Sequence, residues 1–129
     1  MGSLTTMEKE SKENAEQAQM RFCALAYNPQ PWSTRSLPVE PVILFVFQDE
    51  GGGLRFRVSP GLSQIVRDEG LAYIESLLKD FVERSKTCPG GLFQQLCSLA
   101  VGPLVTVEVG SRLSEHPRLQ ELSSHFTPF

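Results

Sequence analysis

The amino-acid sequence predicts an α+β fold. The expected sheet is small and largely antiparallel, and it consists of a hairpin at 42–58 and a strand at 104–109. A long helix at 60–86 covers one face of this sheet, and further helices are expected near the N- and C-termini. Two patterns predict this class. Apolar residues recur every three or four positions through 60–86, which is the period of an amphipathic helix. The segments at 42–58 and 104–109 are instead rich in β-branched and aromatic residues, which is typical of strands. We expect residues 1–129 to form a single domain, a length that supports a core without disulfide or metal staples.

The long helix is expected to begin with Ser59 as N-cap and Pro60 as first helical residue, and to stop before the Cys-Pro-Gly-Gly run at 88–91. Gly70 lies on the buried side of the pattern, where it predicts a kink or a close approach to the sheet. The apolar stripe consists of Leu62, Ile65, Val66, Tyr73, Ile74, Leu77, Leu78, Phe81 and Val82.

The hairpin pairs a fully apolar strand with one that alternates. Val42–Phe47 has no polar residue and is expected to be a central strand buried on both faces. In Leu54–Val58 the apolar residues alternate with Arg55 and Arg57, so we expect both arginines to face solvent on an open side of the sheet. The turn at 48–53 holds three consecutive glycines. It does not indicate a phosphate loop, because no Lys-Ser/Thr follows and no helix begins directly after it.

The last strand, at 104–109, is expected to put Val105, Val107 and Val109 on the core face and Glu108 on the other. A right-handed crossover through the helices would place this strand beside the central one. Glu108 would then lie across from one of the two hairpin arginines, as an opposite-charge pair worth ~0.2–1 kcal/mol.

The segment before the hairpin leaves one question open. Thr5 and Glu8 form a capping box that predicts an N-terminal helix, while residues 1–14 bury little and are expected to fray or be disordered. Met20–Tyr27 fits either the apolar end of that helix or a strand.

The connecting segments are shorter and less regular. Residues 28–41 hold four of the nine prolines, which predicts a loop. Within this loop, Trp32 is expected either to cap an edge of the core or to anchor a partner. Leu92–Ala100 predicts a short helix. The final helix is expected to start at Ser114 as N-cap, with an apolar edge of Leu119, Leu122 and Phe126.

Composition argues against several classes of partner. A net charge of −3 with scattered basic residues gives no footprint for nucleic acid. No apolar run reaches the ~20 residues of a membrane-spanning helix, and the acidic, polar start is no secretory signal. Gly2 fits the spacing of a myristoylation motif, but so short a pattern is often fortuitous, and Gly-Ser after the start Met is also what a cloning remnant leaves. Three cysteines predict free thiols in a reducing, cytoplasmic setting.

Residues able to carry chemistry are few. Cys88, beside the Pro-Gly-Gly run, is the candidate nucleophile, whereas Cys23 and Cys97 fit small core fillers. His116 and His125 are nine positions apart without an accompanying Cys-x-x-Cys, so no metal site is predicted. The acidic pairs at 49–50 and 68–69 fit solvated turn and helix positions. We expect no cofactor.

The three predicted strands are few for a helix with this much apolar surface. Either the N-terminal segment adds a strand, or the sheet's edges and open face meet a partner. We therefore expect a non-catalytic protein-interaction or adaptor domain, a dimer or a subunit of a larger assembly, with a chaperone-like or accessory role. The residues expected to contact the partner are Trp32, Arg55 and Arg57. The alternative is a small-ligand-binding protein or thiol-dependent enzyme with a site near Cys88 and the Asp49–Gly53 turn.

Overall fold

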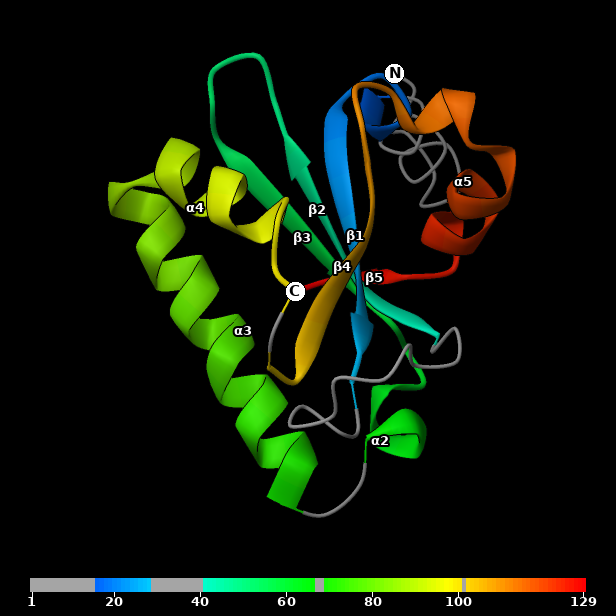
Figure 1. Cartoon of the computed structure of the whole chain (residues 1–129). Coiled ribbons are helices and arrows are strands. Elements are labelled where there is room, and N and C mark those ends of the chain that lie inside the picture. The colour runs from blue at the N-terminus through cyan, green and yellow to red at the C-terminus, as the bar shows by residue number, and fades with distance from the viewer. Residues whose placement is uncertain (1–15, 29–40, 67–68, 101) are drawn as a thin grey trace, which may run out of the picture.

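The computed structural model describes residues 16–28, 41–66, 69–100 and 102–129, and it confirms the α+β class (Figure 1). In this part of the chain, five antiparallel strands form one sheet in the order β4-β1-β2-β3-β5. The strands are β1 (Arg21–Tyr27), β2 (Val42–Gln48), β3 (Leu54–Val58), β4 (Leu104–Gly110) and β5 (Thr127–Pro128). The helices are α2 (Leu62–Ile65), α3 (Glu69–Thr87), α4 (Pro89–Leu96) and α5 (Pro117–Ser124), with a 3-10 turn, η1 (Leu113–Glu115), before α5.

The open question about Met20–Tyr27 is settled in favour of a strand. β1 pairs with β2 on one side and with β4 on the other, and its residues from Phe22 to Ala26 are buried. The placement of the last strand beside Val42–Phe47 is therefore wrong, because β1 and β3 already occupy both sides of β2. The N-terminal segment supplies the missing strand, so a shortage of strands no longer argues for association.

The long helix is interrupted. Val66 has extended backbone (φ −111°, ψ 120°) and ends α2, and α3 begins only at Glu69. At Gly70 an added Cβ would lie 3.2 Å from Val66 Cγ1 and 3.5 Å from the Tyr27 hydroxyl of β1, so its tight contact is with the end of α2 and its contact with the sheet is an ordinary one. Ser59 is not an N-cap of this helix; its Oγ accepts a hydrogen bond from the Gly61 amide at 3.2 Å, and Gly61 precedes α2.

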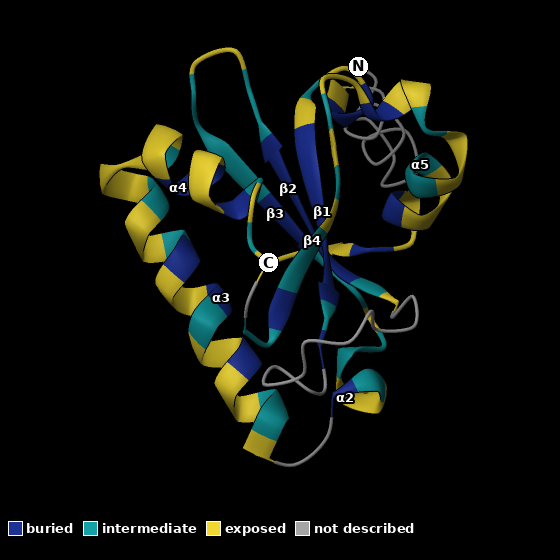
Figure 2. Cartoon of the chain, viewed as in Figure 1, coloured by how far each residue is buried: buried dark blue, intermediate teal, exposed yellow. Residues whose placement is uncertain are grey.

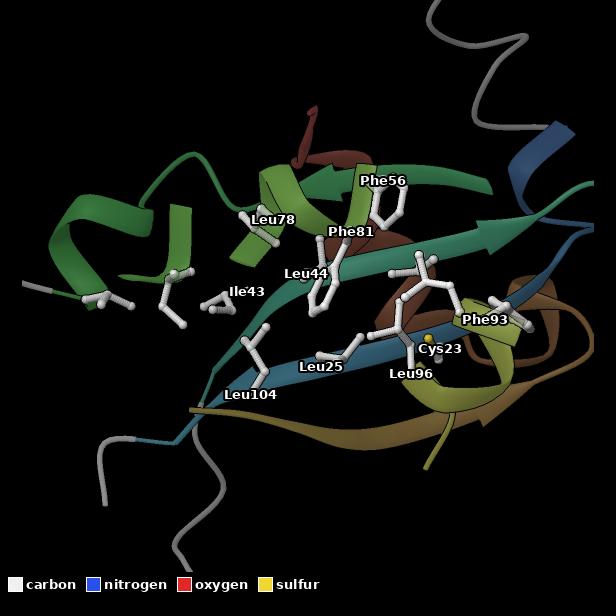
Figure 3. Close-up of a cluster of buried hydrophobic side chains, with 14 residues drawn as sticks. Cys23, Leu25, Ile43, Leu44, Phe56, Leu78, Phe81, Phe93, Leu96 and Leu104 are labelled. Carbon is white, nitrogen blue, oxygen red and sulfur yellow. The ribbon is translucent and has the colours of Figure 1, made fainter. Parts of the chain in front are cut away.

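One core lies between the sheet and the α3 and α4 helices (Figure 3). Helix α3 contributes Ile74, Leu78 and Phe81, which are buried as predicted. Tyr73 is a correction to the predicted stripe, because its side chain is 57% exposed. The sheet and α4 contribute the remaining buried members, which include Cys23, Leu25, Ile43, Leu44, Val46, Phe56, Leu92, Phe93, Leu96 and Leu104.

A second core covers the opposite face of the sheet, so the predicted open face is wrong. Figures 1 and 2 show α5 on the side of the sheet away from α3. The buried members of this cluster are Phe22, Ala24, Phe45, Phe47, Leu113 and Phe126. The phenyl rings of Phe45 and Phe126 meet edge to face at 5.1 Å. Strand β2 therefore places Leu44 and Val46 in the first core and Phe45 and Phe47 in the second, which explains its uninterrupted apolar run.

The C-terminal helix starts two residues later than predicted. Ser114 lies in η1, and His116 precedes Pro117 as the residue before α5. The His116 ring packs against Phe22 at 5.3 Å, and both rings crowd Gly110, where an added Cβ would lie 2.6 Å from Phe22 Cε1. A glycine at the end of β4 thus allows η1 and α5 to turn back over the second core.

Helix α4 begins at Pro89 rather than Leu92 and ends at Leu96. Residues 1–14, Gly2 and Trp32 lie outside the described residues, as does most of the predicted loop 28–41.

Candidate functional site

The β4 edge of the sheet carries exposed apolar side chains. Among the residues that the structure describes, strand β4 is an end strand and pairs only through its β1 side. Ala24 pairs with Glu108 and Leu25 with Thr106, which leaves Val107 as the extra residue of a bulge. Val107 and Val109 are 46% and 42% exposed, so their predicted core positions are wrong. Figure 2 shows this strand largely teal and yellow, in contrast to the dark blue of β1 and β2.

A groove of about 310 Å³ lies beside this edge. One wall is β4 from Thr106 to Val109, and the other is the end of α4 with the following turn, residues 97–100. Because the wall residues include Val107, Val109 and Leu99, the groove combines apolar side chains with a strand edge. This combination suits an extended peptide more than a compact polar ligand.

The first half of the β4 edge is already occupied by the chain itself. The Thr106 amide donates to the Leu99 carbonyl at 2.8 Å. The Thr106 hydroxyl donates to the Leu96 carbonyl at 2.6 Å and accepts from the Leu99 amide at 2.9 Å. The turn after α4 is therefore fastened to Thr106, and the accessible edge begins at the bulge, from Val107 to Gly110.

The opposite edge of the sheet is closed. The short strand β5 pairs with Arg57 and Val58 of β3, and the Phe129 amide donates to the Phe56 carbonyl at 3.0 Å. Pro128 has no amide hydrogen to offer a further strand. The two edges of the sheet thus differ: β5 ends in proline, while β4 presents two exposed valines.

The two hairpin arginines occupy different environments. Arg55 forms an ion pair with Glu16 at 3.7 Å, and the Arg55 side chain is 41% exposed. Arg57 is buried, which corrects its predicted solvent-facing position. Its guanidinium donates to Gln17 Oε1 at 3.1 Å and to the Phe126 carbonyl, tying β3 to the segment before β1 and to the C-terminal segment. Neither arginine faces Glu108, because β1 and β2 lie between β3 and β4.

Residues 49–52 of the Asp49–Gly53 turn line an open groove of about 1000 Å³. Asp49 is engaged within the turn, since its Oδ1 accepts from the Gly53 amide at 2.9 Å. The other lining residues are mostly polar: Glu16, Gln19, Met20, Arg21, Gln48, Glu50, Gly51 and Gly52.

The candidate nucleophile lies elsewhere. Cys88 is exposed and precedes the first turn of α4, where an added Cβ on Gly91 would lie 2.9 Å from its Sγ. Cys88 is not among the residues that line the groove at the Asp49–Gly53 turn. The structure therefore does not join the two halves of the alternative site in a single cavity.

A pair of thiols that the sequence does not reveal lies between β1 and α4. Cys23 is fully buried in β1, while Cys97, directly after α4, is half-buried and packs against the same core. The two thiols are near enough to affect one another's pKa, and neither forms a disulfide. Burial raises the pKa of both thiols; for Cys97 the neighbouring Cys23 thiol and Arg21 offset part of the rise.

Comparison with protein-family models, with curated proteins and with solved structures finds no match to this chain. Among the described residues, no helix has both the length and the apolarity needed to cross a bilayer. The same residues contain no group of three or more His, Cys, Asp or Glu side chains placed to hold a metal ion.

Proposed function

We propose that this chain is a non-catalytic protein-interaction domain, a subunit or adaptor of a larger assembly, that binds a short extended segment of another protein along β4. The observation that carries this proposal is the exposure of Val107 and Val109 on an end strand, directly beside a groove. Three free thiols support a cytoplasmic setting for this accessory role.

Strand addition explains why these features occur together. An added strand gains main-chain hydrogen bonds from the edge, while alternate side chains enter neighbouring pockets. Between Val107 and Gly110 the edge is accessible, and the groove formed with residues 97–100 supplies the pocket. Covering the exposed parts of two valines adds about 1 kcal/mol each, taken as roughly half the value of a fully buried side chain.

The geometry favours a short peptide segment over a second copy of this chain. A symmetric dimer through β4 would pair one β4 edge with another. Here the bulge at Val107 distorts the edge and the Leu99–Thr106 hydrogen bonds occupy its first half. Both features are devices that limit pairing between sheet edges. A short peptide needs only the accessible residues from Val107 to Gly110, whereas a symmetric dimer would pair two such interrupted edges with one another.

Peptide selection on the full-length chain tests this proposal. A displayed library of random peptides of about seven residues, near the usual length of a strand, is selected on the immobilised protein. We expect enriched sequences with small apolar residues at alternate positions. Their affinity should fall by about fivefold or more for Val109→Lys, because the loss of about 1 kcal/mol corresponds to a factor of about five.

Tyr73→Lys is the matched control, because it places the same charge on an exposed residue of α3, away from the groove. Peptides that bind wild type and Val109→Lys equally would overturn the proposal. Sedimentation of the wild type and of Val109→Lys measures the oligomeric state. A wild-type dimer that becomes a monomer in Val109→Lys would show that a second copy of this chain, and not a peptide of another protein, covers the β4 edge.

A small-molecule ligand is the second candidate function, favoured by the size of the groove at the Asp49–Gly53 turn. A fragment screen by NMR on the whole chain tests it, with Arg21→Gln as the variant because Arg21 is a cation in the lining. Amide shifts at residues 48–52 that disappear in Arg21→Gln would support an anionic ligand; shifts elsewhere would count against this site.

A further inference from the structure

The cysteines at 23 and 97 form the one contact in the described residues that brings two thiols together. Cys23 is at 0% exposure on β1, and Figure 3 shows its sulfur beside Phe93 and Leu96 of α4. Cys97 follows α4 directly and also lines the groove beside β4. The Cys97 sulfur thus lies in the partly exposed layer that lines the groove, while the neighbouring Cys23 sulfur lies in the core.

We infer that Cys23 and Cys97 are a modification site, at which a low-molecular-weight disulfide such as oxidised glutathione converts the two thiols to an intramolecular disulfide. The half-buried position of Cys97 makes it the attacking thiol, and the buried position of Cys23 makes it the resolving one.

The exchange proceeds in two steps. The Cys97 thiolate, after losing its proton to solvent, attacks one sulfur of the oxidant; its S–S bond breaks and one glutathione thiolate leaves. The Cys23 sulfur, deprotonated in turn, then attacks Cys97 Sγ; the mixed disulfide breaks and the second glutathione leaves. In total, two protein thiols are oxidised by two electrons and one glutathione disulfide is reduced to two thiols.

The surroundings of Cys23 and Cys97 set the rate of the thiol–disulfide exchange. Burial keeps both sulfurs largely protonated at neutral pH, so the exchange is slow compared with that of an ordinary thiol. The Cys23 thiol and Arg21 both lower the pKa of Cys97 and so offset part of the rise due to burial, whereas the causes at Cys23 all raise its pKa. These interactions favour the thiolate at Cys97, the less buried of the two sulfurs.

Mass spectrometry of the folded full-length chain tests this inference. After incubation with oxidised glutathione, we expect a proteolytic peptide pair joining Cys23 to Cys97, and a glutathione adduct on the exposed, isolated Cys88. In Cys23→Ala, which keeps a small apolar residue in the core, Cys97 has no resolving thiol and should retain glutathione. Cys88→Ser is the matched control and should keep the Cys23–Cys97 link.

Other products decide against the inference. A stable glutathione adduct on Cys97 of the wild type would show that Cys23 does not resolve it. A Cys23–Cys97 link that forms in urea but not in native buffer would show that the pair is not placed for exchange in the folded state. Circular dichroism of Cys23→Ala establishes that the variant is folded before its adducts are compared.

Discussion

Arg55 and Arg57 provide a test of the second core, because they lie two residues apart on β3 and differ in burial. Arg57 donates hydrogen bonds to Gln17 Oε1 and to the Phe126 carbonyl within a buried site. Arg57→Met keeps most of the side-chain volume and removes these donors. Gln17 Oε1 and the Phe126 carbonyl then lose this donor inside the protein, at a cost of about 1–3 kcal/mol each.

We therefore expect Arg57→Met to lower the free energy of unfolding by about 2–5 kcal/mol. Arg55→Met removes only a partly exposed ion pair with Glu16, and its cost should stay below about 1 kcal/mol. In urea titrations with an m-value near 2 kcal/mol/M, the midpoint of Arg57→Met should fall by roughly 1–2.5 M, with the slope unchanged.

Hydrogen exchange provides a second measurement of the same change. The Phe129 amide donates to the Phe56 carbonyl, next to the residue that holds Phe126. Its exchange should accelerate in Arg57→Met and remain unchanged in Arg55→Met. Equal midpoints for the two variants, with equal exchange at Phe129, would refute the idea that Arg57 holds the C-terminal segment on the sheet.

Three further predictions concern the first core and the thiols. Leu78 is 1% exposed, and Leu78→Ala should lower the free energy of unfolding in urea by about 2–5 kcal/mol. Tyr73→Ala on the same helix should change this free energy by less than about 0.5 kcal/mol. Similar losses for the two variants would contradict the burial of the Leu78 side of α3 and the exposure of Tyr73. N-ethylmaleimide labelling followed by mass spectrometry should modify Cys88 first, Cys97 more slowly and Cys23 only on unfolding; early modification of Cys23 would contradict its burial. The raised pKa of Cys23 favours the protonated thiol in the folded state, so its contribution to stability is complete below the ordinary thiol value of 9.0 and is lost as pH rises above it. Stability should then fall by up to about 1.4 kcal/mol per pH unit, and Cys23→Ala should show a smaller fall; identical pH profiles would refute this assignment.

Local patterns predicted most of the secondary structure. The alternation in Leu54–Val58, the apolar run of Val42–Phe47 and the valine-rich segment at 104–109 all correspond to strands. Each pattern depends on residues close in sequence, where alternating or continuous apolar residues over five to seven positions indicate a strand. The break at Val66 was missed because Leu62, Ile65 and Val66 continue the helical spacing, although the backbone becomes extended at Val66.

Positions set by distant contacts were not predictable. Arg55 and Arg57 have the same alternation, and only the packing of Gln17 and Phe126 distinguishes the buried one. The exposure of Val107 and Val109 depends on whether β4 is an end strand, which no local pattern reports. Cys23 and Cys97 each looked like a core filler, and their contact arises only when α4 packs on β1.

The size of the β4 surface limits how it would bind. Two half-exposed valines and a four-residue edge can contribute a few kcal/mol of favourable binding free energy. Each main-chain hydrogen bond adds a net ~0.5–1.5 kcal/mol, and each valine adds about 1 kcal/mol. Loss of translational and rotational freedom opposes binding by an estimated 4–15 kcal/mol. A free peptide is therefore expected to bind weakly. An adaptor of this kind becomes effective when further contacts or a second binding site hold the partner segment close, since tethering raises its effective concentration without new contacts at β4.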